Sequence, residues 1–313
     1  MSKEQLSTRL AAGEAILELA REGMDVVALS ADTSKSMYTS LLKEEFPERF
    51  IDTGIAEQNM IRPAAGLAAT GKIPFAASYS VFTSMRCCEQ LRTFVAYPNL
   101  NVKVIAGIGG FSAGIEGVTH VATEDLGIMR CIANMAVVAP CDYYTTKLAV
   151  KAAAAYPGPV YLRVGRDPSP VVEPQAQEFI IGKPVLHRSG EDILLIATGL
   201  VLTEALDAAD DLRQEGINVG VLEMHTLKPI LDAEDIIARC QKAKKILTIE
   251  EHNIVGGLAS VISELLCGKG EFQLEHMGLK DQFARTGTPQ ELRQYYGMDK
   301  KAITQKVREM KAL

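Results

Sequence analysis

The sequence predicts an α/β protein with two tandem domains, each a mostly parallel sheet covered by helices. Three observations favour this class. The chain has 313 residues, and a typical domain takes roughly 150. Short apolar runs alternate with longer amphipathic stretches, which is the pattern of buried strands and covering helices. This alternation fades once, between residues 165 and 191, and then resumes.

The first domain is predicted over residues 1–170 and is the larger of the two. An amphipathic stretch at 7–22 predicts a helix, and the apolar run at 24–30 predicts the strand after it. Further helices are expected at 57–69, 82–97, 123–134 and 143–155, and further strands at 73–77, 102–106, 136–139 and 160–164.

The pattern fades from 165 to 191, where Pro168, Pro170, Pro174 and Pro184 are scattered among polar residues, and the linker itself is predicted at residues 171–190. The second domain is predicted over residues 191–313. Its strands are expected at 192–197, 219–223 and 245–249, and its helices at 203–215, 233–242, 257–266 and 300–311.

Charge and hydropathy exclude several classes of partner. The chain has 33 lysines and arginines against 39 aspartates and glutamates, a net charge of −6, with no basic block of the kind that binds nucleic acid or anionic lipid. Its apolar runs are shorter than the ~20 residues of a membrane span. Because the start carries no apolar signal region, we expect a cytosolic protein.

Six cysteines without a CxxC motif or a nearby histidine cluster indicate neither a disulfide framework nor a structural zinc site, so no metal ligands are expected in this chain. The vicinal pair Cys87 and Cys88 is read as two small residues packed in a helix, in preference to a redox or metal site.

A glycine-rich stretch at residues 107–114 follows a predicted strand. It fails the dinucleotide-binding fingerprint, because Ser112 stands where the third glycine should be, and no GxxxxGK[ST] phosphate loop occurs elsewhere. The stretch is either a loop beside a ligand or a plain turn.

Two titratable residues are candidates for chemistry. Glu57 starts an otherwise apolar helix, where it is either an acid favoured by the helix dipole or a buried carboxyl group that can hold a proton near neutrality. His120 follows the glycine-rich stretch in a polar loop, and is either a chemical group or a surface residue.

Arg163 and Arg166 end the last strand of the first domain. Arginines at that edge of a parallel sheet either bind anionic ligands or are ordinary surface charges. His225 and His252 lie in the second domain, and we interpret both as structural.

Several motifs, taken together, resemble the thiamine-diphosphate enzymes of the transketolase family. They are DTGIAEQNM at 52–60, YSVF at 79–82, GVTH at 117–120 and EEHNIVGG at 250–257. The resemblance covers nearly the whole chain, in order and at family spacing. It matches only the second half of a full-length transketolase, its pyrimidine-binding and C-terminal domains, and no Gly-Asp-Gly of the diphosphate-binding half occurs.

The resemblance therefore implies the C-terminal subunit of a split, two-component transketolase. Such a chain needs a partner subunit that carries the diphosphate-binding domain and holds most of the Mg²⁺ ligands, and the expected assembly is an α2β2 heterotetramer. The implied reaction transfers a two-carbon ketol unit from a ketose to an aldose.

The resemblance also implies roles for residues around the cofactor. Glu57 matches the glutamate that hydrogen-bonds the pyrimidine ring of thiamine diphosphate, a role suited to a carboxyl group kept out of water. Phe82 matches the aromatic residue that stacks on this ring, and Tyr79 lines the same pocket. Asp32 matches an acid near the positively charged thiazolium ring.

On the substrate side, Arg9, Ser36 and Arg166 match positions that hold the terminal phosphate of a sugar. His120 matches a histidine that contacts hydroxyl groups of the donor, and counts with Glu57 as catalytic. Glu116 aligns with an acid that contacts a hydroxyl group of the acceptor.

One position departs from the family. Twelve residues before His120 the family has a second histidine that contacts the terminal phosphate, and here Ile108 stands there. The hypothesis is a differently placed anion, such as a sulfonate or a branched sugar phosphate.

Two other enzymes share the domains: the β subunit of a 2-oxo acid dehydrogenase E1 component, and deoxyxylulose-phosphate synthase, which is normally a single longer chain. A non-catalytic scaffold subunit is the alternative from another class.

Overall fold

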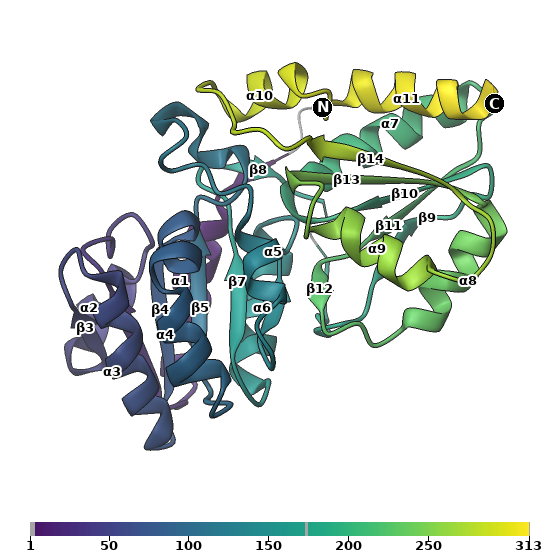
Figure 1. Ribbon diagram of the computed structural model, residues 1–313. Coiled ribbons are helices and arrows are strands. Elements are labelled where there is room, and N and C mark those ends of the chain that lie inside the picture. Colours follow the sequence, from purple (N-terminus) through teal and green to yellow (C-terminus); the bar gives the residue numbers. More distant parts are fainter. Residues whose placement is uncertain (1–3, 173–174, 313) are drawn as a thin grey trace.

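The computed structural model describes residues 4–172 and 175–312. Residues 1–3, at the start that was read for a signal region, and Pro174 of the expected linker lie outside this range. The two tandem α/β domains predicted from the sequence are confirmed, and they lie side by side with the amino-terminal domain at the purple-to-teal end of the colour scale (Figure 1).

The first domain is built on a seven-stranded sheet in the order β12-β6-β7-β5-β4-β2-β3. Its strands are parallel except β12, which pairs antiparallel with β6. Every residue of the central strands β2, β5 and β7 is buried, as expected for a sheet with helices on both faces. The strands are β2 (Val26–Ser30), β3 (Phe50–Asp52), β4 (Ile73–Tyr79), β5 (Lys103–Gly107), β6 (Ala136–Val138), β7 (Val160–Arg163) and β12 (Thr226–Lys228).

The helices of the first domain begin at clear capping residues in two cases. Ser7 accepts a hydrogen bond from the Leu10 N–H at the start of α1, and Asp142 and Thr145 form a capping box on α6. The α-helices are α1 (Thr8–Arg21), α2 (Ser40–Glu45), α3 (Glu57–Ala69), α4 (Cys88–Gln90), α5 (Asp125–Arg130) and α6 (Tyr143–Ala155). Short 3₁₀ or π turns are η1 (Pro47–Arg49), η2 (Phe82–Arg86), η3 (Leu91–Ala96) and η4 (Phe111–Glu116), and a two-stranded ribbon joins β1 (Gln5–Leu6) to β8 (Ser169–Pro170).

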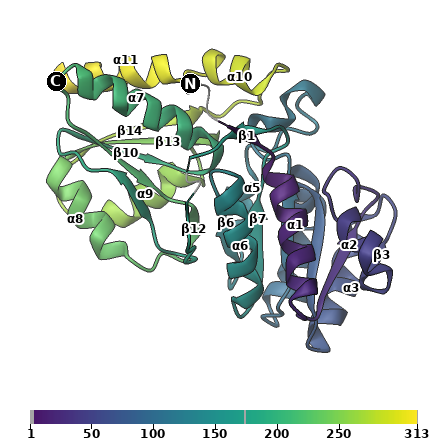
Figure 2. The same cartoon turned by 180° about the vertical axis from the view of Figure 1, so that it is seen from behind.

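The second domain has a five-stranded sheet in the order β14-β13-β10-β11-β9, parallel except for β9. Helices α7 and α11 cover one face and α8 and α9 the other, as both views show (Figures 1 and 2). The strands are β9 (Val185–Arg188), β10 (Ile193–Ala197), β11 (Val219–Glu223), β13 (Lys245–Asn253) and β14 (Gln273–Leu279). The helices are η5 (Gly199–Val201), α7 (Leu202–Gln214), α8 (Ala233–Ala243), α9 (Leu258–Leu266), α10 (Pro289–Tyr295) and α11 (Lys300–Ala312).

The structure adds elements that the sequence pattern did not predict. β3 has only three residues, and the five N-terminal residues of β14 are half-buried, so neither gives a clear apolar run. β9 lies within the stretch 171–190 and pairs with β11 of the second sheet. The predicted helix at 82–97 is split into η2, α4 and η3, and the predicted helix at 123–134 is reduced to α5.

The two domains share apolar cores. One buried cluster joins Leu29 and Val104 of the first sheet to Leu194 and Leu222 of the second, and another joins Ile108 and Phe111 to residues of the second domain. All six cysteines are free, with Cys87 buried and Cys88 half-buried. Within residues 4–172 and 175–312, no helix is long and apolar enough to cross a membrane, and no group of three or more His, Cys, Asp or Glu side chains is arranged to hold a metal ion.

Candidate active site

The candidate residues lie at the carboxyl ends of parallel strands of the first sheet. Ser36 follows β2, Glu57 follows β3, and Tyr79 is the last residue of β4. His120 comes after β5, and Arg166 comes three residues after β7. Ligands of parallel α/β sheets bind at this edge, because the loops that leave the strands converge there.

Glu57 is buried at the first turn of α3, with only 5% of its surface exposed. Its Oε1 accepts a hydrogen bond from Arg86 Nη1 at 3.0 Å. The Arg86 guanidinium also lies over the ring of Phe82, 3.7 Å from its centroid. One planar cation therefore contacts both the carboxylate and the aromatic face.

Three rings form a cluster beside this pair. The ring centroid of Phe82 lies 5.9 Å from that of Tyr79 and 5.2 Å from that of His120, and the last contact is edge-to-face. Tyr79 and His120 are 6.2 Å apart. Phe82 begins η2, a π-helical turn, and such turns recur at functional sites because they change the direction of side chains within a helix.

The predicted anion-binding residues form one hydrogen-bonded chain. The Tyr79 hydroxyl donates to Ser36 Oγ at 3.1 Å, and Arg9 Nη1 donates to the same oxygen at 2.7 Å. Arg9 Nε and Nη2 donate to the carbonyl of Arg166, and Arg166 forms an ion pair with Glu116. Burial lowers the pKa of Arg9 below its ordinary value, but a guanidinium remains charged at neutral pH.

Asp32 stands apart from this chain of contacts. It follows β2 with a positive φ of 58°, and its side chain is exposed. Asp52 Oδ1 fixes the turn by accepting hydrogen bonds from the backbone N–H groups of Asp32 and Gly54, at 3.0 and 2.9 Å. The structure thus brings the other eight predicted site residues into one continuous set of contacts and leaves Asp32 at its rim.

Ile108 is 2% exposed and packs in the buried cluster with Phe111 and Val121. Its φ is 53°, an unusual value for a β-branched residue, so its backbone is held in place by its surroundings.

The glycine-rich stretch is packed against charged side chains. A Cβ on Gly109 would lie 2.2 Å from Arg163 Nε, and one on Gly110 would lie 2.6 Å from Glu251 Oε2. Glycine is required at these two positions because a guanidinium and a carboxylate lie against the backbone and leave no room for a Cβ. The stretch is therefore packed at the domain boundary, which neither of the two expectations, a loop beside a ligand or a plain turn, had described. Arg163 is accordingly buried and is not a surface charge.

His252 and His225 have structural surroundings. His252 Nε2 accepts the Gly127 N–H at 3.2 Å, and its Nδ1 donates to the carbonyl of Asn253. Burial lowers the pKa of both histidines, which favours the neutral ring. The ring of His225 packs against that of Phe179 at a tilt of 34°, with 4.0 Å between the ring centroids.

Arg86 belongs to the site but is not among the residues predicted from the sequence. Arg86 follows Phe82 by four residues, a spacing that puts two side chains on one face of a helix, and this was the available signal. Glu251 was not predicted either, because its contacts reach across the domain boundary and no spacing in the sequence indicates them.

Comparison with known proteins assigns the chain to a family. Residues 4–170 match the family pattern described as Transketolase, pyrimidine binding domain, and residues 182–303 match Transketolase, C-terminal domain. The chain belongs to the transketolase family.

Within this family, the chain is similar nearly end to end to separate C-terminal subunits. A protein of Methanocaldococcus jannaschii, named for the C-terminal section of a transketolase, is 43% identical over 300 residues, which cover 95% of this chain and 94% of that protein. The 6-deoxy-6-sulfo-D-fructose transketolase subunit of a Clostridium species is 38% identical, over 94% of this chain and 91% of that one.

A solved split-gene transketolase, described as an inactive β4 tetramer, superposes with a TM-score of 0.90 at 39% identity, covering 98% of this chain and 99% of that chain. Human transketolase is 33% identical, but the matched region covers 97% of this chain and only 49% of the human protein.

The family uses thiamine diphosphate, and the residues present fit its pyrimidine ring. The ring is planar and carries hydrogen-bonding nitrogens. Glu57 and Phe82 already hold a planar group with N–H donors, the Arg86 guanidinium, by one hydrogen bond and one stacking contact. Arg86 must leave Phe82 for a ring to stack on the face that it covers.

Proposed function

We propose that this chain is the C-terminal subunit of a thiamine-diphosphate-dependent transketolase, which transfers a two-carbon ketol unit from an anionic ketose to an aldose. A partner subunit with the diphosphate-binding domain would complete each site and hold most of the Mg²⁺ ligands. The observation that carries the proposal is the pairing of buried Glu57 with the face of Phe82 through one planar group.

Each residue has a defined task in this proposal. When bound, thiamine diphosphate supplies a nucleophilic carbon for carbon–carbon bond cleavage and formation. Glu57 shares a proton with a nitrogen of the pyrimidine ring, and its burial excludes water from that hydrogen bond. Phe82 and Tyr79 pack against the ring, and Asp32 places a negative charge at the rim of the site.

On the substrate side, His120 contacts donor hydroxyl groups and Glu116 those of the acceptor. Arg9, Ser36 and Arg166 bind the terminal anion. In the free chain Arg166 is paired with Glu116, so the substrate anion would exchange places with a carboxylate.

The terminal anion is proposed to be a sulfonate or a branched sugar phosphate. Ile108 removes one donor at the position of a family histidine, and it is packed among apolar side chains. The name of the Clostridium relative specifies a sulfonated ketose. A panel of ketose donors assayed with the reconstituted pair tests this point, and a clear preference for xylulose 5-phosphate would contradict it.

The test of the reaction itself uses Glu57→Ala in the complex with the partner subunit, thiamine diphosphate and Mg²⁺. We expect turnover to fall by roughly two orders of magnitude or more while assembly, followed by size-exclusion chromatography, is retained. Glu44→Ala, an exposed acid on α2, is the control. Unchanged activity of Glu57→Ala would favour the scaffold alternative, and pyruvate decarboxylation without ketose activity would favour the dehydrogenase β subunit. The α2β2 stoichiometry and the cytosolic location remain predictions.

A further inference from the structure

The segment of residues 111–122 carries two of the substrate-contacting residues, Glu116 and His120. It is a 3₁₀ turn followed by a loop, and its central part faces solvent: Ile115 is 60% exposed and Val118 is 46% exposed. A short exposed segment has few contacts of its own to fix it. Glu116 and His120 have side-chain contacts of their own, with Arg166 and with Phe82, but the course of the backbone that carries them depends on what holds the two ends.

The beginning of the segment is held by the second domain. The N–H of Phe111 donates to Glu251 Oε2 at 3.3 Å, and the ring of Phe111 stacks on Tyr296 with 5.5 Å between centroids. Gly287 N–H donates to the carbonyl of Gly114 at 3.1 Å. A Cβ on Gly114 would lie 2.3 Å from the Gly287 oxygen, so the two backbones are in direct contact.

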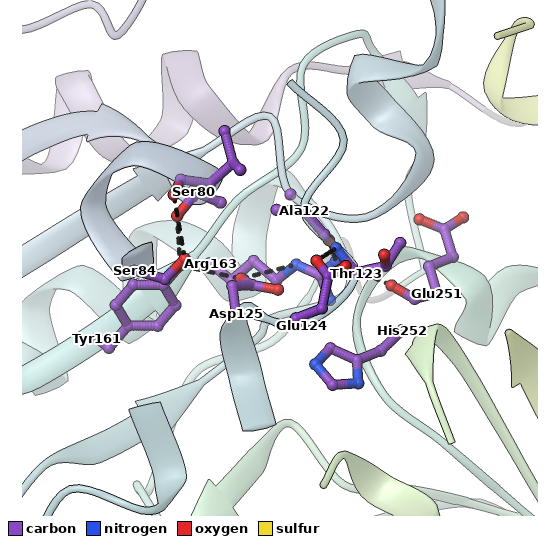
Figure 3. A network of polar contacts seen from close by, with 12 residues as sticks. Ser80, Ser84, Ala122, Thr123, Glu124, Asp125, Tyr161, Arg163, Glu251 and His252 are labelled. Carbon is purple, nitrogen blue, oxygen red and sulfur yellow. Dashed lines mark hydrogen bonds and ion pairs between the residues drawn. The ribbon is translucent and has the colours of Figure 1, made fainter. Parts of the chain in front are cut away.

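The end of the segment is held by Arg163. Its Nη2 donates to the carbonyl of Ala122 at 2.8 Å and to the carbonyl of Glu251 at 2.9 Å. Figure 3 shows this network at the junction of the two domains. The adjacent Thr123 carbonyl accepts the N–H of Asn253, a residue of β13, at 2.7 Å. The two ends also pair with each other, because Gly110 N–H donates to the Ala122 carbonyl at 3.0 Å.

The charges of this network are buried and balanced. Asp125 lies 3.4 Å from Arg163 Nε and accepts a hydrogen bond from the Tyr161 hydroxyl at 2.9 Å. Glu251 pairs with Arg293 Nε at 2.5 Å. Asp125, Glu251 and Arg163 are 0%, 5% and 8% exposed. Removing one charge from such a set leaves its partner buried without compensation, so each of these contacts is costly to break.

Domain association alone does not require this network, because two apolar clusters already span the boundary. The polar contacts instead act on particular backbone groups of the segment. Glu251 binds the N–H of residue 111 at its beginning, and Arg163 binds the carbonyl of residue 122 at its end. Hydrogen bonds of this kind fix positions more narrowly than apolar packing does.

We propose that Glu251 and Arg163 are positioning residues. Glu251 of the C-terminal domain holds the beginning of segment 111–122, and Arg163 of β7, bound to the Glu251 carbonyl, holds its end, so that together they set the places of Glu116 and His120 at the substrate. This inference rests on the proposed transketolase function. It gives the second domain a part in the reaction although none of its side chains belongs to the proposed site.

The test compares Glu251→Gln with Glu264→Gln in the reconstituted complex. A glutamine at 251 keeps the size of the side chain, but Phe111 N–H donates to Oε2 and Arg293 Nε to Oε1, so an amide NH₂ group would face one of the two donors and lose that hydrogen bond. Glu264 also pairs across the domain boundary, with Arg130 at 2.5 Å, but does not touch the segment. Arg163→Lys is the second variant, since an ammonium group keeps the charge but loses the planar fork of donors.

We expect Glu251→Gln and Arg163→Lys to lower kcat/KM for the ketose donor on the order of tenfold or more, with a raised donor KM, while the Kd for thiamine diphosphate stays within about twofold. Hydrogen exchange in the chain alone is the second readout. The amides of residues 110–111 and 120–122 should exchange faster in both variants and at the wild-type rate in Glu264→Gln.

A donor kcat/KM equal to wild type in both variants would overturn the inference. So would a loss of cofactor affinity in step with donor kcat/KM, because it would indicate general damage to the fold. If the wild-type complex lacks transketolase activity, the proposed function fails instead, and unchanged hydrogen exchange in the variants would then separately reject the hold on the segment.

Discussion

Arg86 occupies the contacts that a pyrimidine ring would need, and removing it should strengthen cofactor binding. Its guanidinium covers Phe82 at 3.7 Å and pairs with Glu57 at 3.0 Å, and about half of its side chain, 49%, is exposed. In wild type, binding must break both contacts. In Arg86→Ala they are already absent, and Glu57 is left buried without its partner.

The magnitude follows from the two contacts. A partly exposed ion pair contributes about 0.5–1 kcal/mol, and a cation–π contact at an exposed site contributes about 0.5–1 kcal/mol. Together they oppose binding by roughly 1–2 kcal/mol, so the Kd for thiamine diphosphate should fall about fivefold to thirtyfold.

Isothermal titration calorimetry on the reconstituted complex with Mg²⁺ measures this change. Arg92→Ala, which removes another exposed arginine from the adjoining turn η3, should leave the Kd unaltered. Weaker binding in Arg86→Ala than in wild type would refute the reasoning, because it would mean that Arg86 itself holds the cofactor.

Three further changes test other parts of the structure. Burial raises the pKa of Glu250 from 4.5 to about 7. Between these two pH values the folded chain holds a proton on Glu250 that the unfolded chain does not, so the stability that Glu250 contributes is lost as pH rises. Urea unfolding from pH 5 to 8 should therefore show the difference in unfolding free energy between wild type and Glu250→Gln shrinking as pH rises. Arg9→Lys should raise the donor KM roughly tenfold with little change in cofactor Kd, since lysine cannot bridge Ser36 and the Arg166 carbonyl, and an unchanged donor KM would exclude Arg9 from anion binding. Gly109→Ala should cost about 1–3 kcal/mol of unfolding free energy because its Cβ would meet Arg163, and a wild-type urea midpoint would contradict that packing.

Much of the fold was predictable because its elements are periodic and buried. β2, β5 and β10 are buried throughout and mostly apolar, with Ser30 and Lys103 as the exceptions, and near-continuous apolar runs of this kind are typical of strands covered on both faces. β9 was not predicted as a strand, because its exposed residues give no such run and its pairing with β11 depends on tertiary contact.

The contacts of the site likewise fall into those that the sequence predicts and those that it does not. Residues at strand ends converge by topology, so the meeting of Tyr79 and Ser36 follows from the order of the parallel strands. The contact between Phe111 and Glu251 joins positions 140 residues apart in different domains. Local sequence patterns carry no information on such a pair, because either residue alone looks like an ordinary loop or strand residue.

The strand β12 has a consequence for dividing this protein. It comes from the second half of the chain but pairs along β6, at the border of the first sheet. A fragment cut after the linker would lack β12, so the backbone N–H and C=O groups on one side of β6 would be unpaired. An unprotected edge strand of this kind pairs with other chains and promotes aggregation. Any chimera that exchanges the second domain between relatives must therefore keep residues 226–228 with the sheet that they complete.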